Sequence, residues 1–272
     1  MIQVASLTPA EIARYHDQGY LIPSFTLPRA RIDRMRDTLD RLIRDNPGVR
    51  PEKLVSAHVV GKGGGANTEG IKGSQDFLDL AMEPEILDMV EQLIGPDIVL
   101  WGCHVFCKPA GDGHETPWHQ DGHYWPIRPL ANVTVWVALD ASTTENGCLR
   151  VIPKSHQSKI THPHLLEDRA DLVLSQRTSD DAFDVREAVD LELQPGQMSM
   201  HDVHMIHGAN VNHSTKRRAG VALRYMPGTS VFERNLNPAD GKSGVPVAFA
   251  SRPLWLLRGQ DRTGRNDFKV GH

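Results

Sequence analysis

Hydrophobic positions near the start of the chain recur every three or four residues, which is the spacing of one face of a helix. Two segments show this pattern clearly, residues 28–46 and residues 84–94, and a Gly-Pro pair directly after the second would end a helix there. Such faces pack against a core, so both helices are expected to be structural. We therefore expect a helical N-terminal part over about residues 1–95.

The beginning of the chain also carries a helix-initiation signal. Thr8 is followed by Pro9 and, three positions on, by Glu11, which is the form of a capping box. Gly19 would end this helix, and the apolar residues directly after it predict a short strand.

After residue 96 the pattern changes to short runs rich in β-branched and aromatic residues, separated by Gly, Pro and Asn turns. The runs are IVLWGCHVF, NVTVWVAL, CLRVI, LELQPGQMSMHDVHMIH and RAGVALRYMP. Strands without long helices between them favour an antiparallel sandwich or barrel. We expect a mainly β fold with flanking α-helices, in a single domain over residues 1–272. Its β core should cover about 96–230, followed by a C-terminal extension at 231–272.

Composition narrows the class of partner. The 272 residues, 39% of them hydrophobic, are enough to bury a core. The net charge of -4 comes from interspersed charges, which provide no basic stripe for nucleic acid and no polybasic segment for a membrane. No apolar run reaches the roughly 18 to 20 residues of a membrane span, and MIQVASLTPAE does not resemble a signal peptide. We expect a small-molecule partner, no nucleic acid, no membrane, and a cytoplasmic location.

Two local patterns could suggest other functions. The three cysteines are too few to staple a chain of this length, which fits a reducing compartment. Cys103 and Cys107, with His104 between them, fit zinc-site spacings poorly and are better interpreted as small buried residues on a strand. The glycine-rich stretch at 61–67 lacks the residue order of a phosphate-binding loop, so we expect a mobile loop near an active-site mouth.

The stretch PWHQDGHYWP concentrates groups that can bind a metal. In an extended strand, His119 and Asp121 point to the same side and can place an imidazole nitrogen and a carboxylate oxygen on one ion. With 14 histidines in the chain, such a triple is expected about once by chance, so a third ligand is needed. PGQMSMHDVHMIHG supplies His201, His204 and His207. On one continuous strand, His201 and His207 would share a face and His204 would point to the other.

Two imidazoles and a carboxylate on one face of an ion, with the opposite positions open, form the facial triad of non-heme Fe(II) oxygenases. Arg218 follows on what should be the adjacent strand, where its guanidinium could bind a carboxylate through two hydrogen bonds.

Together these residues resemble the phytanoyl-CoA dioxygenase family of Fe(II)- and 2-oxoglutarate-dependent oxygenases. The resemblance covers most of the chain and is densest in HQDGHYWPIRP, VTVWVALDASTTENGCLRVIPKSH and PGQMSMHDVHMIHGANVNHSTKRRAGVALRY. It implies a double-stranded β-helix core of the jelly-roll, cupin-like type. It also implies iron ligands at His119, Asp121 and His207, with Fe(II), 2-oxoglutarate and O2 as cofactor and co-substrates.

The resemblance assigns further roles around the co-substrate. Arg218 matches the arginine that pairs with the distal carboxylate of 2-oxoglutarate, Trp136 a tryptophan beside it, and Lys108 a basic position that helps to hold it in some members. Thr134 should share a face with Trp136, so strand geometry predicts that it contacts a carboxylate too. Many relatives carry Ser where this chain has Ala209, so a hydroxyl contact to 2-oxoglutarate is missing here or supplied elsewhere.

Four further residues, His123, Trp125, Arg128 and Arg150, are candidates for substrate contact. His123 lies one alternation beyond Asp121 on the expected strand, and Trp125 could be either a core ring or a pocket wall. Arginines in segments expected around the barrel mouth favour an anionic or zwitterionic substrate; they are Arg128, Arg150, Arg224 and Arg234.

The carboxylate at Asp121 favours hydroxylation, because related halogenases carry a small residue at this position. The resemblance implies hydroxylation of an unactivated C–H bond, with release of succinate and CO2. The arginines favour an amino acid derivative, organic acid or organophosphonate as the substrate. One alternative keeps these cofactors but ends in desaturation, epimerisation or carbon–heteroatom cleavage. Another is a cupin-like module that binds a metal or organic acid without turnover. A zinc hydrolase is disfavoured because no His-Glu-x2-His motif is present and Arg218 would be unexplained.

Overall fold

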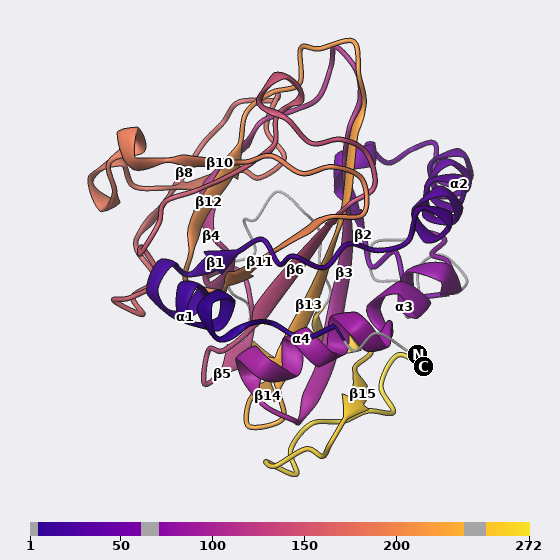
Figure 1. Cartoon of the computed structure of the whole chain (residues 1–272), viewed down its shortest axis with the longest axis vertical. Coiled ribbons are helices and arrows are strands. Elements are labelled where there is room, and N and C mark those ends of the chain that lie inside the picture. The colour runs from indigo at the N-terminus through magenta and orange to yellow at the C-terminus, as the bar shows by residue number, and fades with distance from the viewer. Residues whose placement is uncertain (1–4, 61–70, 237–248) are drawn as a thin grey trace.

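The computed structural model describes residues 5–60, 71–236 and 249–272 (Figure 1). The glycine-rich stretch at 61–67, expected to be a mobile loop, lies outside the described residues. In the described ranges the helices are α1 (Pro9–Gln18), α2 (Arg29–Asp45), α3 (Gln75–Ala81) and α4 (Pro84–Ile94).

Outside these helices the regular structure is mainly antiparallel β-sheet, so the prediction of a mainly β fold with flanking helices is confirmed. The larger sheet has the order β1-β11-β6-β13-β3-β15, and β2 also pairs with β3. Its strands are β1 (Tyr20–Leu21), β2 (Leu54–Val55), β3 (Ile98–Lys108), β6 (Val133–Ala138), β11 (Met198–Asp202), β13 (Arg218–Pro227) and β15 (Trp255–Arg258).

A smaller sheet has the order β10-β7-β12-β4. It consists of β4 (Thr116–Gln120), β7 (Leu149–Val151), β10 (Val189–Leu191) and β12 (Ile206–Ala209). Two short strand pairs are also present among the described residues, β5 (Ile127–Arg128) with β14 (Val231–Phe232), and β8 (His164–Leu166) with β9 (Gln176–Thr178).

The helices form where the sequence pattern predicts them, with one exception. In α1, the hydroxyl of Thr8 accepts a hydrogen bond from the amide of Glu11 at 3.2 Å, and the Glu11 carboxylate accepts one from the amide of Thr8 at 2.7 Å. Gly19 ends the helix at φ 82°, a left-handed conformation that favours glycine. Helix α3 is the exception, because its seven residues are too few to show a helical repeat in the sequence.

The core lies between these helices and one face of the larger sheet. Buried side chains of α2, α3 and α4 form a single apolar cluster with alternate residues of β3, β6 and β13. Helix α4 packs against β3, β6 and β13 and lies in front of these strands in Figure 1. The residues between them along each strand point to the opposite face, away from the helices. That opposite face is therefore free to form a site.

One strand prediction is wrong. The segment from His201 to His207 is two strands, because a turn at Val203–His204 separates β11 from β12. Strand β11 belongs to the larger sheet and β12 to the smaller one, so the turn carries the chain from one sheet to the other. His201 and His207 therefore do not lie on one strand face.

No helix within the described residues has the length and apolar character needed to cross a membrane. The cytoplasmic location stays a prediction. Cys103 and Cys107 lie buried on β3, as expected.

The capping box of α1 makes a stability prediction. Replacing Thr8 by Ala removes the side-chain acceptor for the Glu11 amide, so the free energy of unfolding should fall by about 1 kcal/mol. Urea denaturation of the two proteins measures the change. Thr215→Ala, at an exposed bend, is the matched control and should change stability by less than half as much. Equal effects at the two positions would contradict the capping interpretation.

Candidate active site

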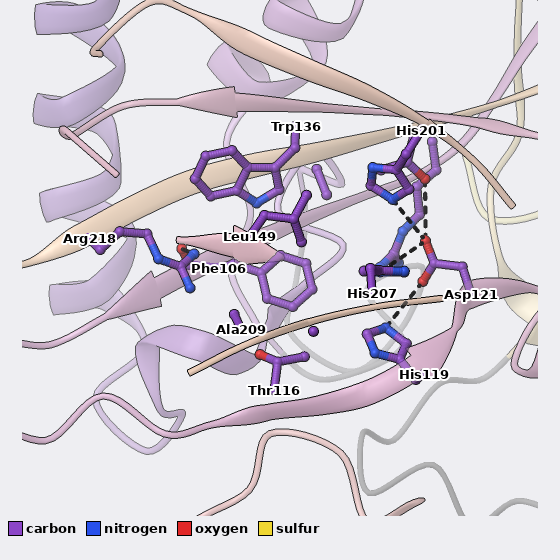
Figure 2. A pocket seen from close by; sticks show the side chains of 14 residues that line it. Phe106, Thr116, His119, Asp121, Trp136, Leu149, His201, His207, Ala209 and Arg218 are labelled. Carbon is purple, nitrogen blue, oxygen red and sulfur yellow. Dashed lines mark hydrogen bonds and ion pairs between the residues drawn. The ribbon is translucent and has the colours of Figure 1, made fainter. Parts of the chain in front are cut away.

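A pocket lies between the two main sheets (Figure 2). The larger sheet contributes lining residues from β3, β6, β11 and β13, namely Phe106, Thr134, Trp136, His201, Arg218, Ala222 and Arg224. The smaller sheet contributes residues of β4, β7 and β12, namely Thr116, His119, Leu149, His207, Gly208 and Ala209. Asp121, directly after β4, completes the lining.

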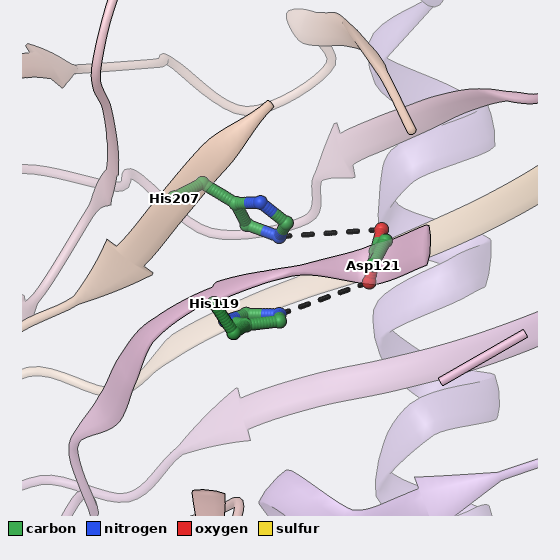
Figure 3. Close-up of side chains that lie close together, drawn as sticks. All are labelled: His119, Asp121 and His207. Atoms are coloured by element: carbon green, nitrogen blue, oxygen red, sulfur yellow. Dashed lines mark ion pairs between the residues drawn. The ribbon is translucent and has the colours of Figure 1, made fainter. Parts of the chain in front are cut away.

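Three of the lining residues could hold a metal ion. His119 on β4 pairs directly with His207 on β12, and their ring centroids are 4.1 Å apart. Asp121 lies one residue beyond the end of β4, with its Oδ1 3.7 Å from Nε2 of His119 and its Oδ2 4.0 Å from Nε2 of His207. One ligand atom from each of the three residues lies within 4.8 Å of the others. In Figure 3 both imidazole rings point towards the carboxylate.

Hydrogen bonds hold both imidazoles with Nε2 facing the centre. Nδ1 of His119 lies 2.9 Å from the carbonyl of Pro117, and Nδ1 of His207 lies 2.9 Å from the carbonyl of Met205. A carbonyl oxygen can only accept, so each Nδ1 must donate, which leaves the lone pair on Nε2. Metal-binding histidines are commonly oriented in this way.

Protonation also suits metal binding. Burial alone would raise the pKa of Asp121, but contacts with His119 and His201 outweigh it and hold the pKa well below its usual value. Burial, reinforced by His119, lowers the pKa of His207 well below its usual value. The centre therefore offers an ionised carboxylate and a neutral imidazole, the forms that bind metals. Two nitrogens and one carboxylate oxygen on one side of a buried centre fit Fe(II).

Arg218 lies on the far side of the pocket from this triad, with Phe106 and Leu149 between them in Figure 2. It is only 3% exposed, and burial lowers its pKa to about 10. One Nη donates to the carbonyl of Phe106 at 3.3 Å, while Nε has no hydrogen-bond partner among the described residues. A buried guanidinium with an unused donor is suited to binding an anion from outside the chain.

Trp136 lies beside Arg218, whose Cζ is 5.4 Å from the centroid of the indole ring. The ring covers Gly220, which lies between Phe106 and Ala138 in the sheet. A Cβ on Gly220 would overlap the indole ring, so only glycine allows Trp136 its position.

Comparison with known proteins identifies the family. Residues 15–220, most of the chain, match the phytanoyl-CoA dioxygenase (PhyH) family. The chain belongs to this family. It is 26% identical to the peroxisomal phytanoyl-CoA dioxygenase of Bos taurus, over 78% of this chain and 66% of that protein. The predicted family is therefore confirmed, and the described donor set of His119, Asp121 and His207 fits the predicted Fe(II).

Two further relatives are named for enzymes other than phytanoyl-CoA dioxygenase. A probable alpha-ketoglutarate-dependent hypophosphite dioxygenase of Stutzerimonas stutzeri is 29% identical over 55% of this chain and 53% of its own length. An L-proline trans-4-hydroxylase of Streptomyces griseoviridis is 30% identical over 61% of this chain and 59% of its own length. The matches with these two and the bovine enzyme thus span between about half and two thirds of each relative.

The fold is also that of a known oxygenase structure. The apo form of the non-heme monooxygenase ThoJ superposes with a TM-score of 0.70 at 24% identity, and the match covers 92% of this chain and 84% of that one.

Lys108 and Thr134, both expected to contact the co-substrate, have hydrogen-bond partners within the described part of the chain. Lys108 does not line the pocket; its ammonium donates to the carbonyls of Ala209 and Asn210 and so connects β3 to the end of β12. Thr134 does line the pocket, but its hydroxyl donates to Oδ2 of Asp121 at 3.4 Å, so its carboxylate partner within the described residues is that of Asp121.

Two of the expected substrate residues, His123 and Trp125, lie outside the pocket lining. Strand β4 ends before Asp121, and a 3-10 turn at Asp121–His123 breaks the alternation on which the expectation for His123 relied. The His123 ring stacks on His164 instead, with centroids 3.9 Å apart. Trp125 is a core ring packed against Trp101, with centroids 4.6 Å apart.

The other two, Arg128 and Arg150, are bound elsewhere. Arg128 donates to the carbonyl of Ile127 at 2.6 Å, and Arg150 pairs with Asp190 at 2.8 Å. Of the four arginines expected near the mouth, only Arg224 lines the pocket.

Thr116 lines the pocket although the sequence analysis did not single it out. The pairing of β4 with β12 shifts between His119 and Thr116, so three steps on β4 oppose two on β12. This bulge brings Thr116 opposite Ala209 and onto the pocket side together with His119. Strict alternation would have placed Thr116 and His119 on opposite faces, so no sequence signal identified it.

The contact between Gly220 and Trp136 makes a testable prediction. Gly220→Ala forces the indole ring to move, so the Kd for 2-oxoglutarate should rise about tenfold, in line with an overpacking cost of about 1 to 3 kcal/mol. Isothermal titration with the Fe(II) protein measures the Kd. Gly48→Ala is the control, because an added Cβ there meets nothing within 4 Å. An unchanged Kd in Gly220→Ala would show that the ring position does not matter for co-substrate binding.

Proposed function

We propose that this protein hydroxylates an unactivated C–H bond in a small anionic or zwitterionic metabolite, with release of succinate and CO2 from 2-oxoglutarate. The observation that carries the proposal is the buried triad of His119, Asp121 and His207 facing Arg218 across one pocket. The substrate would be an amino acid derivative, organic acid or organophosphonate. Two relatives are named for hypophosphite and for L-proline, both small charged molecules, which supports a substrate of this kind.

His119, Asp121 and His207 would hold the iron, each through the atom that already faces the centre. Bound Fe(II), with 2-oxoglutarate and O2, would supply the oxidation of the C–H bond. The carboxylate of Asp121 favours hydroxylation, because it takes the position that a halide would need. Thr134 donates to Oδ2 of Asp121 and would hold this carboxylate in its orientation.

Arg218 would bind the distal carboxylate of 2-oxoglutarate through its guanidinium, whose Nε is unused within the described part of the chain. The Trp136 ring would flank the co-substrate beside Arg218. Phe106 and Leu149 line the space between Arg218 and the triad, and their apolar side chains would exclude water from it.

We also propose that Thr116 supplies the hydroxyl that many relatives have at the position of Ala209. Thr116 pairs directly with Ala209 across β4 and β12, and both line the pocket. Figure 2 shows the two side chains next to each other on the side of the pocket near Arg218.

For the fold, we propose that the two sheets on either side of the pocket form a double-stranded β-helix. The chain would act as one oxygenase domain, since the helices and β15 pack against the same larger sheet.

Two alternatives have distinct outcomes. Desaturation, epimerisation or carbon–heteroatom cleavage would use the same cofactors and differ only in the product, which mass spectrometry identifies. A cupin-like binding module would release no succinate with any substrate. The unused donor of Arg218, across the pocket from a complete triad, favours an enzyme over such a module.

The first test is an anaerobic titration with Fe(II) and then 2-oxoglutarate, followed by the visible charge-transfer band of the chelate. The band should form with the unmodified protein and be lost in Asp121→Ala and His207→Ala, because each removes one ligand. His204→Ala is the control; this side chain bonds to Asp202 at 3.2 Å and lies outside the pocket lining, so the band should persist. A band that survives in His207→Ala would refute the ligand assignment.

A second test addresses Thr116. Thr116→Val removes the hydroxyl but keeps the shape, so the Kd for 2-oxoglutarate should rise about tenfold, as for one lost hydrogen bond to a charged group. Adding Ala209→Ser to this variant should restore much of the affinity, because the hydroxyl returns on the paired residue. If Thr116→Val binds 2-oxoglutarate as tightly as the unmodified protein, the hydroxyl comes from elsewhere or is not needed.

A further inference from the structure

A cross-strand row of the larger sheet passes next to Asp121. Arg224 on β13 pairs with Gly102 on β3 and with Thr134 on β6, and Thr134 pairs in turn with His201 on β11. Directly paired residues point to the same face of a sheet. Arg224, Thr134 and His201 accordingly all line the pocket, and the Thr134 hydroxyl bonds to Asp121.

His201 borders the proposed iron site but is not one of its ligands. The ligand atoms that lie within 4.8 Å of one another belong to His119, Asp121 and His207. His201 is 2% exposed, and neither of its ring nitrogens has a hydrogen-bond partner in the described ranges. Its Nε2 is 3.7 Å from Oδ2 of Asp121, too far for a hydrogen bond. Burying imidazole nitrogens without hydrogen bonds costs free energy, and a bound ligand that accepts a hydrogen bond from the ring would remove this cost.

Arg224 is held in place by aromatic rings. Its Cζ lies 4.9 Å from the ring centroid of Trp125 and 5.6 Å from that of Trp101. On the opposite strand, Gly102 has no side chain, and the space beside it is taken by the aliphatic part of Arg224. A guanidinium fixed by stacking loses little further entropy when it binds a carboxylate or phosphonate with two parallel hydrogen bonds.

The pocket thus contains two arginines from one face of β13, Arg218 and Arg224, with Gly220 and Ala222 at the alternate positions between them. Six residues of strand span about 20 Å between their Cα atoms, so the guanidinium groups serve different regions of the pocket. In the proposed function Arg218 binds the distal end of 2-oxoglutarate. Arg224, in the row that passes Asp121, is positioned for the other molecule in the reaction.

We propose that Arg224 and His201 form the subsite that receives an anionic group of the substrate. This inference rests on the proposed function and narrows its substrate class to molecules that carry a carboxylate, a phosphonate or a similar oxyanion. Arg224 pairs with two oxygens of that group, and His201 donates a hydrogen bond to it. With the anionic group held there, the C–H bond that lies at the iron is the one at the matching distance from that group.

The test uses the anaerobic Fe(II)–2-oxoglutarate protein and follows the change of its charge-transfer band on addition of a probe. The probes are hypophosphite, L-proline and pentanoate, with L-prolinamide and pentanamide as counterparts that lack the carboxylate. At least one of the three anions should change the band. If it is L-proline or pentanoate, its amide should require at least about a tenfold higher concentration for the same change. Arg224→Gln should raise the apparent Kd for that anion about tenfold or more, while the Kd for 2-oxoglutarate stays the same.

Three further variants complete the design. Arg224→Lys keeps the charge but not the paired donors and should give an intermediate loss, which also guards against misfolding of Arg224→Gln. Arg14→Gln is the matched control, because this arginine also lies over an aromatic ring, Tyr20 at 5.5 Å, but outside the pocket. His201→Leu should weaken anion binding in the same direction as Arg224→Gln.

The inference is overturned if none of the three anions changes the band, if the amides act equally well, or if Arg224→Gln leaves anion binding intact. A raised Kd for 2-oxoglutarate alone in Arg224→Gln would instead assign this arginine to the co-substrate, and would overturn it too. Absence of the band in the unmodified protein is a different result, because it refutes the iron and 2-oxoglutarate site itself.

Discussion

The direct pairing of His119 with His207 across β4 and β12 is the contact on which the site depends. It brings two imidazoles from distant parts of the chain to a ring distance of 4.1 Å, and hydrogen bonds to nearby carbonyls fix their orientation. Because backbone pairing sets this geometry, the nitrogens are in place before any metal arrives. Asp121 needs only to follow β4 by one residue to complete the donor set.

The fold also positions the charged groups of the pocket before any ligand binds. Asp121 and Arg218 are both buried, each would be costly to bury alone, and they lie on opposite sides of the pocket. The carboxylate is stabilised by its histidine neighbours, whereas the guanidinium keeps an unused donor among the described contacts. The folded chain therefore offers a metal-binding carboxylate and a free guanidinium donor at defined points of the pocket, and bound ligands would complete the hydrogen bonding there.

Local signals in the sequence were sufficient for helices α1, α2 and α4 and for most strands, because capping and periodicity act over a few residues. The triad and Arg218 were found through motif resemblance, and the structure brings them to one pocket. Departures from regular strands could not be predicted. The turn at Val203–His204, the 3-10 turn after β4 and the bulge before His119 each break the alternation, and each depends on pairing with a distant strand. They decide the positions of His201, His123 and Thr116.

The indole of Trp136 occupies the volume that a side chain at Gly220 would need. Neither position can therefore diverge alone: a larger residue at 220 requires a smaller ring at 136, and a smaller ring leaves a void beside Arg218 until 220 grows. The two residues form a coupled pair in evolutionary terms, and they should change together, or not at all, among descendants of this chain that keep the same co-substrate.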